Sequence, residues 1–166
     1  MSAHAHKSSG PRRVRCAVIT VSDTRTEETD TSGARIKDLL AASGHELLDY
    51  GIVRDEPDDI RRKLLEMPAP VQVVILNGGT GLARRDTTFE AVQGLFDKTL
   101  DGFGELFRML SWEQIGAAAM LSRATAGVIG SRIVFSLPGS TAAVDLAMSK
   151  LVLPELGHVV GLLSGE

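Results

Sequence analysis

Apolar residues along this chain gather into short runs that are separated by longer stretches with helical spacing. Four runs of six to eight residues are rich in β-branched side chains and short for a helix. Such runs are typical of buried strands. The four predicted strands are residues 14–21, 47–53, 71–76 and 132–137.

The stretches between these strands favour helices. One begins with capping residues 30–33 and has its apolar side chains at helical spacing, and a second begins at Pro57, which suits a first helical position. Further helices are predicted after residue 87, around residues 103–110, from Ser140 to about residue 152, and from Pro154 to about residue 163. Because strands alternate with helices, we expect an α/β fold with a mainly parallel sheet and helices on both faces.

The most informative stretch is the loop after the third predicted strand. It reads Asn-Gly-Gly-Thr-Gly over residues 77–81, and glycines let a backbone take positive φ angles and approach a ligand closely. Thr87 and Glu90 then have the spacing of a capping box at the start of a helix. Backbone N–H groups of such a loop and helix start bind phosphate, and Asp86 beside them is placed to hold a Mg²⁺ ion.

The same loop has a second interpretation. It matches neither the G-x-x-x-x-G-K-[ST] nor the G-x-G-x-x-G phosphate-binding pattern. A glycine turn that only joins a strand to a helix would look alike, with Asp86 favouring the positive end of the helix dipole. The local pattern leaves both interpretations open.

Polar side chains recur at the predicted carboxyl end of each strand, where open α/β sheets bind their ligands. We expect these side chains to converge on one rim: Ser22, Asp23, Asp55, Thr80, Asp86 and Ser140. No core segment offers a histidine that could act as a general base, since His45 and His158 fall near helix ends. Phosphoryl or nucleotidyl transfer to an already ionised phosphate suits such a rim.

Composition narrows the class of protein. A chain of 166 residues with 43% hydrophobic and 23% charged residues is typical of one globular domain, which we assign to residues 13–166 after a disordered tail at 1–12. The net charge of −3 gives no general nucleic-acid footprint, and no apolar run spans a membrane. The polar start is no secretory signal, and the lone Cys16, interpreted as a core residue, fits a reducing, cytoplasmic compartment.

Two aromatic features of the second half are interpreted as packing. Phe103, Leu106, Phe107 and Leu110 form one helical stripe, which is typical of a core-facing helix. Trp112 stands in an apolar context, where packing is commoner than stacking on a heterocycle. We therefore expect both features to lie in the core.

Several motifs in order resemble the MoaB/MogA family of molybdenum cofactor biosynthesis proteins. They are the segments at residues 19–33 (ITVSDTRTEETDTSG), 77–92 (NGGTGLARRDTTFEAV), 102–116 (GFGELFRMLSWEQIG), 121–128 (LSRATAGV) and 137–144 (LPGSTAAV). The Asp-Thr-Ser-Gly loop, the Phe-Arg-Met-Leu-Ser segment and the short C-terminus resemble the MoaB branch. The resemblance implies a three-layer α/β/α sandwich, the molybdopterin-binding fold.

The resemblance also implies an activity, the adenylylation of molybdopterin by Mg-ATP with release of pyrophosphate. Matched to this family, Gly78, Gly79, Thr80 and Gly81 would bind the nucleotide, together with Gly104 and Glu105. Asp55 and Asp86 would be the catalytic, metal-binding carboxylates, and Ser22, Asp23, Gly139 and Ser140 would lie near the pterin. Residues 55–59 hold four acids, so the match to Asp55 could instead fall on another of them. Interpreted without the resemblance, Asp58 and Asp59 are first-turn acids that favour the helix dipole.

Two hypotheses follow from the resemblance. The chain is either an active molybdopterin adenylyltransferase or a catalytically silent molybdopterin-binding or assembly protein of the same pathway. The presence of both Asp55 and Asp86 favours the enzyme, since metal-assisted transfer needs the ion and its ligands. Small-molecule substrates, a homo-oligomer (trimer or hexamer) and contacts with other enzymes of the pathway are the implied partners.

Overall fold

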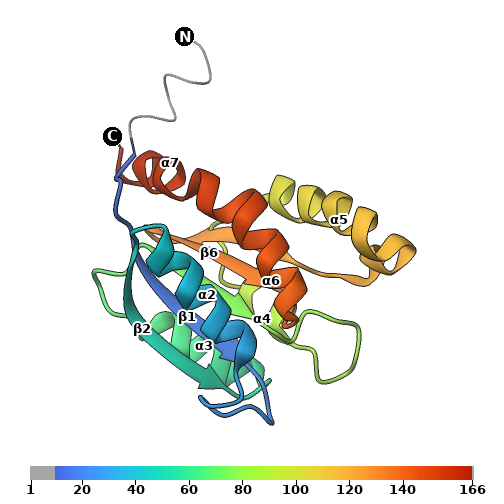
Figure 1. Cartoon of the computed structure of the whole chain (residues 1–166). Helices are drawn as coiled ribbons and strands as arrows, with labels where there is room; N and C mark the ends of the chain where they lie inside the picture. The colour runs from blue at the N-terminus through green and yellow to red at the C-terminus, as the bar shows by residue number, and fades with distance from the viewer. Residues whose placement is uncertain (1–9, 166) are drawn as a thin grey trace.

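The computed structural model describes residues 10–165 and arranges them as a mixed six-stranded sheet between two layers of helices (Figure 1). Residues 1–9 of the predicted tail lie outside the described residues. The strands are β1 (Arg15–Val21), β2 (Glu46–Val53), β3 (Val73–Asn77), β4 (Lys98–Thr99), β5 (Thr125–Ile129) and β6 (Arg132–Leu137). The helices are α2 (Thr31–Ala42), α3 (Pro57–Leu65), α4 (Thr88–Gln93), α5 (Asp101–Ile115), the 3-10 helix η1 (Gly116–Leu121), α6 (Thr141–Ala147), the π-helix η2 (Met148–Val152) and α7 (Leu153–Ser164).

The sheet has the order β2-β1-β3-β6-β5-β4, and its first four strands are parallel. β5 pairs antiparallel with both β6 and β4. The predicted mainly parallel sheet is therefore confirmed, and the carboxyl ends of β1, β3 and β6 lie side by side. This arrangement brings the loops after these three strands together at one edge of the sheet.

Side chains of the central strands alternate between two cores, as the period of a strand requires. In β3, Val73 and Ile75 pack under α2, α5, α6 and α7, whereas Val74 and Leu76 pack against α3 and α4. The three-layer α/β/α sandwich is thus confirmed. Cys16 of β1 is buried in the first core, and burial raises the pKa of its thiol to about 12. Such a thiol is a packing group and no nucleophile at neutral pH.

Strand β5 is missing from the sequence prediction, because Gly127 and Gly130 look like chain breakers in this segment. Gly127 instead lies within β5, where an added Cβ would stand 2.4 Å from ring atoms of Phe96. Gly130, with a φ of +61°, lies between β5 and β6. The glycine that looks like a breaker is there because an aromatic ring packs against the strand.

The predicted break at Pro154 is also wrong. Helices α6, η2 and α7 form one continuous stretch, Thr141–Ser164. A proline inside a helix conflicts with the carbonyl group four residues earlier. Here the turn before it is a π turn, in which the N–H of Leu153 donates to the carbonyl of Met148. Because a π turn is wider, the helix continues through the proline.

That helical stretch is long and apolar enough to cross a membrane by length and composition alone. In the structure one of its sides packs on the sheet, with Val144, Met148, Leu156 and Val160 buried in the first core. This buried side explains part of the hydrophobicity of the helix.

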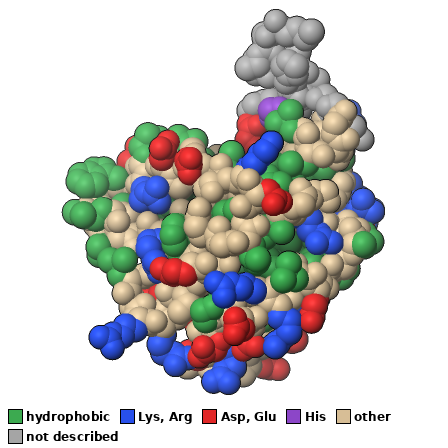
Figure 2. Space-filling model, turned by 180° about the vertical axis from the view of Figure 1, so that it is seen from behind, with side chains coloured by type: hydrophobic (Ala, Val, Ile, Leu, Met, Phe, Trp, Pro, Cys, Tyr) green, Lys and Arg blue, Asp and Glu red, His purple; other side chains and the backbone are tan. Residues whose placement is uncertain are grey.

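Helix α5 is only half a core helix. Phe103 and Phe107 are buried and Leu110 is partly buried, which confirms part of the predicted stripe, but Leu106 is 46% exposed. The prediction for Trp112 is wrong, because its side chain is 61% exposed. Trp112 belongs to a group of exposed apolar side chains on α5 and η1, the α5–η1 patch, which Figure 2 shows as hydrophobic atoms at one edge of the molecule. The patch consists of Leu106, Met109, Trp112, Ile115 and Met120.

Candidate functional site

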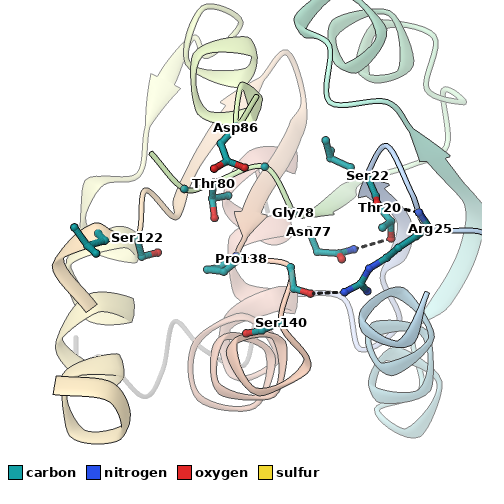
Figure 3. Close-up of a pocket in the computed structure, with 15 residues that line it drawn as sticks. Thr20, Ser22, Arg25, Asn77, Gly78, Thr80, Asp86, Ser122, Pro138 and Ser140 are labelled. Atoms are coloured by element: carbon teal, nitrogen blue, oxygen red, sulfur yellow. Dashed lines mark hydrogen bonds between the residues drawn. The ribbon is translucent and has the colours of Figure 1, made fainter. Parts of the chain in front are cut away.

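A cavity of about 600 Å³ lies where the loops after β1, β3 and β6 meet (Figure 3). It is lined by Thr20, Val21, Ser22, Arg25, Asn77, Gly78, Gly79, Thr80, Gly81, Asp86, Leu121, Ser122, Pro138, Gly139 and Ser140. The eight that the sequence already singles out are Ser22, Gly78, Gly79, Thr80, Gly81, Asp86, Gly139 and Ser140. The predicted rim is therefore a real cavity, and most of the predicted side chains face it.

The glycine loop between β3 and α4 can take its course only with glycine at two positions. Gly78 has a φ of +105°, and an added Cβ there would stand 2.3 Å from the carbonyl oxygen of Val21. Gly79 has a φ of +66°, and an added Cβ would stand 2.2 Å from Oγ1 of Thr88. The loop thus passes within reach of β1 and keeps its backbone against the cavity, as a phosphate-binding loop must.

Arg123, which the sequence prediction does not assign to the site, fastens this loop from the far side. Its Nε donates to the carbonyl of Gly81 at 3.0 Å, and its Nη2 donates to the carbonyl of Asp86 at 2.9 Å. Its backbone N–H also donates to the carbonyl of Thr80. Five N–H donors on a planar fork allow one arginine to bind several carbonyls at once. No signal in the sequence links residue 123 to a loop forty residues earlier.

The predicted capping box is wrong. Glu90 forms an ion pair with Arg123, whose hydrogen bond lowers the pKa of this carboxyl, and Thr87 makes no side-chain cap. The start of α4 is capped instead by Asp55 from the loop after β2. Its Oδ1 accepts from the backbone N–H of Thr87 at 3.0 Å and from the Thr87 hydroxyl at 2.9 Å. A carboxylate near in space replaces the local cap that the spacing predicts.

Asp55 is buried behind the glycine loop and does not line the cavity. A Cβ added at Gly79 would stand 2.8 Å from Oδ2 of Asp55 and 2.2 Å from Oγ1 of Thr88, so both oxygens lie on the same side of Gly79. Within residues 10–165, that Thr88 hydroxyl is one of two buried side-chain oxygens without a hydrogen-bond partner. The structure therefore places a carboxylate oxygen and an unsatisfied hydroxyl together beneath Gly79.

Asp86 is the one carboxylate among the described residues that line the cavity. Its Oδ2 accepts from the backbone N–H of Ala83 at 3.0 Å, which turns the side chain toward Gly81. Figure 3 shows the carboxylate beside Thr80, on the side of the cavity that the glycine loop forms. This position agrees with the predicted role of Asp86 near phosphates.

Three other predicted residues lie outside the cavity. Asp23 accepts from the backbone N–H of Asp55 and from Nε of Arg85 at 2.9 Å, so it links neighbouring loops. Its hydrogen bond is also the main cause that raises the pKa of Arg85. Gly104 and Glu105 line a separate hollow of about 310 Å³ beside Phe89, which shares no lining residue with the cavity.

The floor of the cavity holds a polar network that the sequence prediction leaves out. Nδ2 of Asn77 donates to Oγ1 of Thr20 at 2.9 Å, and Oγ of Ser32 donates to Oδ1 of Asn77 at 2.7 Å. Nη1 of Arg25 donates to Oγ of Ser32 at 2.7 Å. In the sequence, nothing distinguishes Arg25 from the other charged residues between the first predicted strand and the helix after it.

The chemistry open to this cavity follows from what lines it. Arg25 and Asp86 are the charged members, and none of the fifteen lining residues in the described part of the chain is a histidine, lysine or cysteine. Within residues 10–165 no three His, Cys, Asp or Glu side chains form a metal cluster. A cavity with backbone amides, hydroxyls and a guanidinium binds anions well, and its described lining residues include no histidine or lysine to act as a general base.

Comparisons with known proteins agree with this geometry. Residues 17–158 match the family model described as "Probable molybdopterin binding domain". Molybdenum cofactor biosynthesis protein B of Bacillus subtilis (strain 168) is 56% identical over 163 residues, which cover 96% of each chain. The protein of the same name from Bacillus cereus is 54% identical over 162 residues, with the same coverage.

Solved structures give the same result. A crystal structure of a molybdenum cofactor biosynthesis protein B is 53% identical, with a TM-score of 0.91, and the match covers 94% of this chain and 99% of that one. The tungsten cofactor synthesizing protein MoaB from Pyrococcus furiosus is 41% identical with a TM-score of 0.81, covering 90% and 96%. A MogA structure is 26% identical with a TM-score of 0.82, covering 90% and 99%.

Proposed function

The chain belongs to the MoaB branch of the molybdopterin-binding family of molybdenum cofactor biosynthesis proteins, and we propose that it is a molybdopterin adenylyltransferase. In this reaction an oxygen of the pterin's terminal phosphate attacks the α-phosphorus of ATP. The bond from that phosphorus to the oxygen bridging to the β-phosphate breaks, and pyrophosphate leaves with this oxygen. The products are adenylyl-molybdopterin and pyrophosphate.

One observation supports the proposal: the cavity offers hydrogen-bond donors suited to phosphates, and none of its described lining residues is a histidine or lysine that could act as a general base. The described residues that line it offer glycine-loop amides, serine hydroxyls, Arg25 and a single carboxylate, Asp86. The attacking phosphate is already ionised near neutral pH, because its second pKa is about 6. The protein therefore has to align two anions and needs no residue to remove a proton.

Residue roles follow from position. The backbone of Gly78–Gly81 would bind the nucleotide phosphates on one side of the cavity, and Ser22, Gly139 and Ser140 would bind the pterin on the other. Asp23 would act indirectly, by linking the loops of Asp55 and Arg85. A nucleotide role for Gly104 and Glu105 stays a prediction, because they line a separate hollow.

The residues present fit a Mg²⁺ ion that arrives with the nucleotide. Mg²⁺ is usually held by one or two carboxylates together with substrate phosphates and waters. Asp86 faces the cavity, and Asp55 with the unsatisfied hydroxyl of Thr88 lies behind Gly79. Such an ion would neutralise charge on the phosphates as they approach. Asp86 and Asp55 are the proposed ligands, while Asp58 and Asp59 pair with Arg61 and Arg62 on α3.

The direct test is incubation of the purified chain with molybdopterin, ATP and Mg²⁺. We expect the adenylylated pterin and pyrophosphate to form in equal amounts, measured by chromatography and a pyrophosphate assay. Pyrophosphate without adenylylated pterin would show hydrolysis of ATP, and neither product would contradict the proposal.

A catalytically silent molybdopterin-binding protein is the second candidate. It is favoured by the engagement of Asp55 Oδ1 with Thr87, because this occupies an oxygen of one of the two proposed metal ligands. Calorimetry distinguishes the candidates, because a silent protein would bind molybdopterin with the same affinity whether or not Mg-ATP is present, and would yield no product.

We also propose that the chain forms a homo-oligomer through the α5–η1 patch. A contiguous group of exposed apolar side chains marks an interaction surface. Trp112→Glu should lower the mass measured by light scattering, whereas Leu162→Glu, at an exposed position of α7, should leave it unchanged. A wild-type monomer would contradict this proposal. Trimer versus hexamer, contacts with other pathway enzymes and a cytoplasmic location stay predictions.

A further inference from the structure

Arg25 occupies a position in the cavity that no motif assigns. It comes from the loop between β1 and α2, and Figure 3 shows its side chain crossing toward the loop after β6. Its Nη2 donates to the carbonyl of Gly139 at 3.3 Å, and its Nη1 donates to Ser32 and Asp30. The guanidinium therefore bridges two of the three loops that form the cavity.

The guanidinium is fixed by hydrogen bonds, but some of its N–H donors have no acceptor among the described residues. Within residues 10–165, Nη1 and Nη2 have three acceptors between them and Nε has none, although the group carries five N–H donors. The side chain of Arg25 is still 33% exposed. Donors remain that can face a ligand.

Asp30 is the carboxylate that holds Arg25, and it is fully buried. Its Oδ2 accepts from Thr20 at 2.5 Å and from Tyr50 at 2.7 Å, and its Oδ1 accepts from the backbone N–H of Gly33 at 2.9 Å. Burial disfavours the charged form, but these donors outweigh it and keep the pKa of Asp30 below its usual value. Since Asp30 contacts Arg25 at 3.4 Å only through Oδ1, it fixes the guanidinium with one bond.

Two serine hydroxyls that line the same cavity as Arg25 accept hydrogen bonds from the backbone. Oγ of Ser22 accepts from the backbone N–H groups of Thr24 and Arg25, and Oγ of Ser140 accepts from the N–H of Ala143. A hydroxyl that accepts from the backbone keeps its own proton to donate. Both serines line the cavity, so a guanidinium and two O–H donors converge there.

The cavity therefore has a positive charge on one side and a negative charge on the other. Of the described residues that line it, Arg25 is the one cation and Asp86 the one anion, and Figure 3 shows them on opposite sides of Asn77 and Gly78. A ligand with a phosphate monoester would place it at Arg25, away from the carboxylate. Charge-assisted hydrogen bonds from a guanidinium favour such a group over a neutral one.

We propose that Arg25 binds the phosphate monoester of the pterin substrate, and that Asp30 is the positioning residue that holds the guanidinium at the cavity wall. This inference rests on the proposed function and deepens it, since it assigns the phosphate to one wall of the cavity. Ser22 and Ser140 supply the neutral donors of the same subsite. The nucleotide would lie along the glycine loop with its α-phosphate turned toward the pterin phosphate, because the proposed transfer requires the two groups to meet.

The test compares two ligands on the wild type and four variants by calorimetry: a pterin with a side-chain phosphate monoester, and the same pterin without it. For Arg25→Ala we expect the phosphorylated pterin to bind about 10- to 100-fold more weakly, the effect of losing a hydrogen bond to a charged group. The unphosphorylated pterin should bind within about twofold of wild type, because it has no group at Arg25. Arg35→Ala, which breaks an ion pair with Asp145 outside the cavity, is the matched control and should change neither affinity.

Arg25→Lys should recover part of the loss, since it keeps the charge without the planar fork. Asp30→Asn should narrow the preference for the phosphorylated ligand, and a purely structural role would weaken both ligands alike. Equal weakening of both ligands by Arg25→Ala, or no weakening, would overturn the inference and leave the proposed function standing. Failure of the wild type to bind either pterin would overturn both.

Discussion

Two glycine-containing loops face each other across the cavity, and they use glycine for different reasons. The loop after β3 has glycines with φ angles of +105° and +66°, and side chains from three other segments, Asp55, Arg123 and Thr88, surround it. The loop after β6 has no positive φ within residues 138–140, and Ser140 caps α6 locally. The first loop depends on tertiary contacts, whereas the second follows from its own sequence.

The two loops also meet. An added Cβ on Gly139 would stand 3.2 Å from Cα of Gly78, a tight but not impossible approach. The loop after β6 therefore needs a small residue at position 139, because the backbone of Gly78 passes close to it. The comparison predicts that substitutions in the first loop cost more, and affect the nucleotide side, while those in the second are mild and affect the pterin side.

The largest effect should come from Gly78→Ala. The added methyl group meets the backbone carbonyl of Val21 at 2.3 Å and sits at a positive φ, so we expect about 3–5 kcal/mol less free energy of unfolding. Denaturant titration measures this loss. Gly139→Ala should cost only about 1 kcal/mol. Gly102→Ala, which meets open space in α5, should cost nothing or stabilise by up to about 1 kcal/mol. Equal losses of unfolding free energy at positions 78 and 139 would contradict the proposed difference between the two loops.

The next largest effect should be on the rate of adenylylation, from a substitution at Asp86. Asp86→Asn keeps the size of the side chain but removes the charge proposed to hold Mg²⁺, so adenylylation should fall by on the order of 10²–10³. Pterin binding, which belongs to the other wall, should survive, and higher Mg²⁺ should restore part of the rate. Asp59→Asn, at a surface ion pair on α3, is the control. Normal turnover of Asp86→Asn at low Mg²⁺ would contradict the proposed metal role. The carboxylate of Asp86 would then have only a structural role, accepting from the N–H of Ala83.

A smaller effect is expected from Arg123→Ala, which releases the glycine loop without touching the cavity directly. Loss of its bonds to the carbonyls of Gly81 and Asp86 should weaken ATP binding by about tenfold and speed hydrogen exchange of the amides at 81–86. Arg62→Ala on α3 removes a comparable surface charge and should alter neither. Unchanged exchange in the loop would mean that its course does not depend on Arg123.

The smallest effect should come from Ser140→Ala in the second loop. Loss of the cap on the N–H of Ala143 should cost about 1 kcal/mol of unfolding free energy. Binding of a phosphorylated pterin should weaken by less than about tenfold, as expected for one neutral hydrogen bond. Thermal denaturation and calorimetry check both values. An effect on ATP affinity larger than that on pterin affinity would reverse the roles of the two walls.

The sequence by itself determined the parts of this protein that depend on nearest neighbours. Alternating apolar runs and helix starts gave β1, β2, β3 and β6 within a few residues, and hence the parallel sheet with its site at the carboxyl ends of the strands. The serine cap at Ser140 is also local, because its hydroxyl accepts from a backbone N–H only three residues later. The family could be identified from the sequence for the same reason, since its motifs are continuous segments of the chain.

The tertiary structure decided what depends on residues far apart in the chain. Asp55 replaced the local cap of α4, Arg123 reached a loop forty residues earlier, and Gly127 entered a strand because Phe96 lies against it. Arg25 became the cation of the cavity through Asp30 and Gly139, the second of which lies 114 residues away. Burial and hydrogen bonding of this kind override local preference, because an unsatisfied polar group or a steric clash costs more free energy than a less favoured turn.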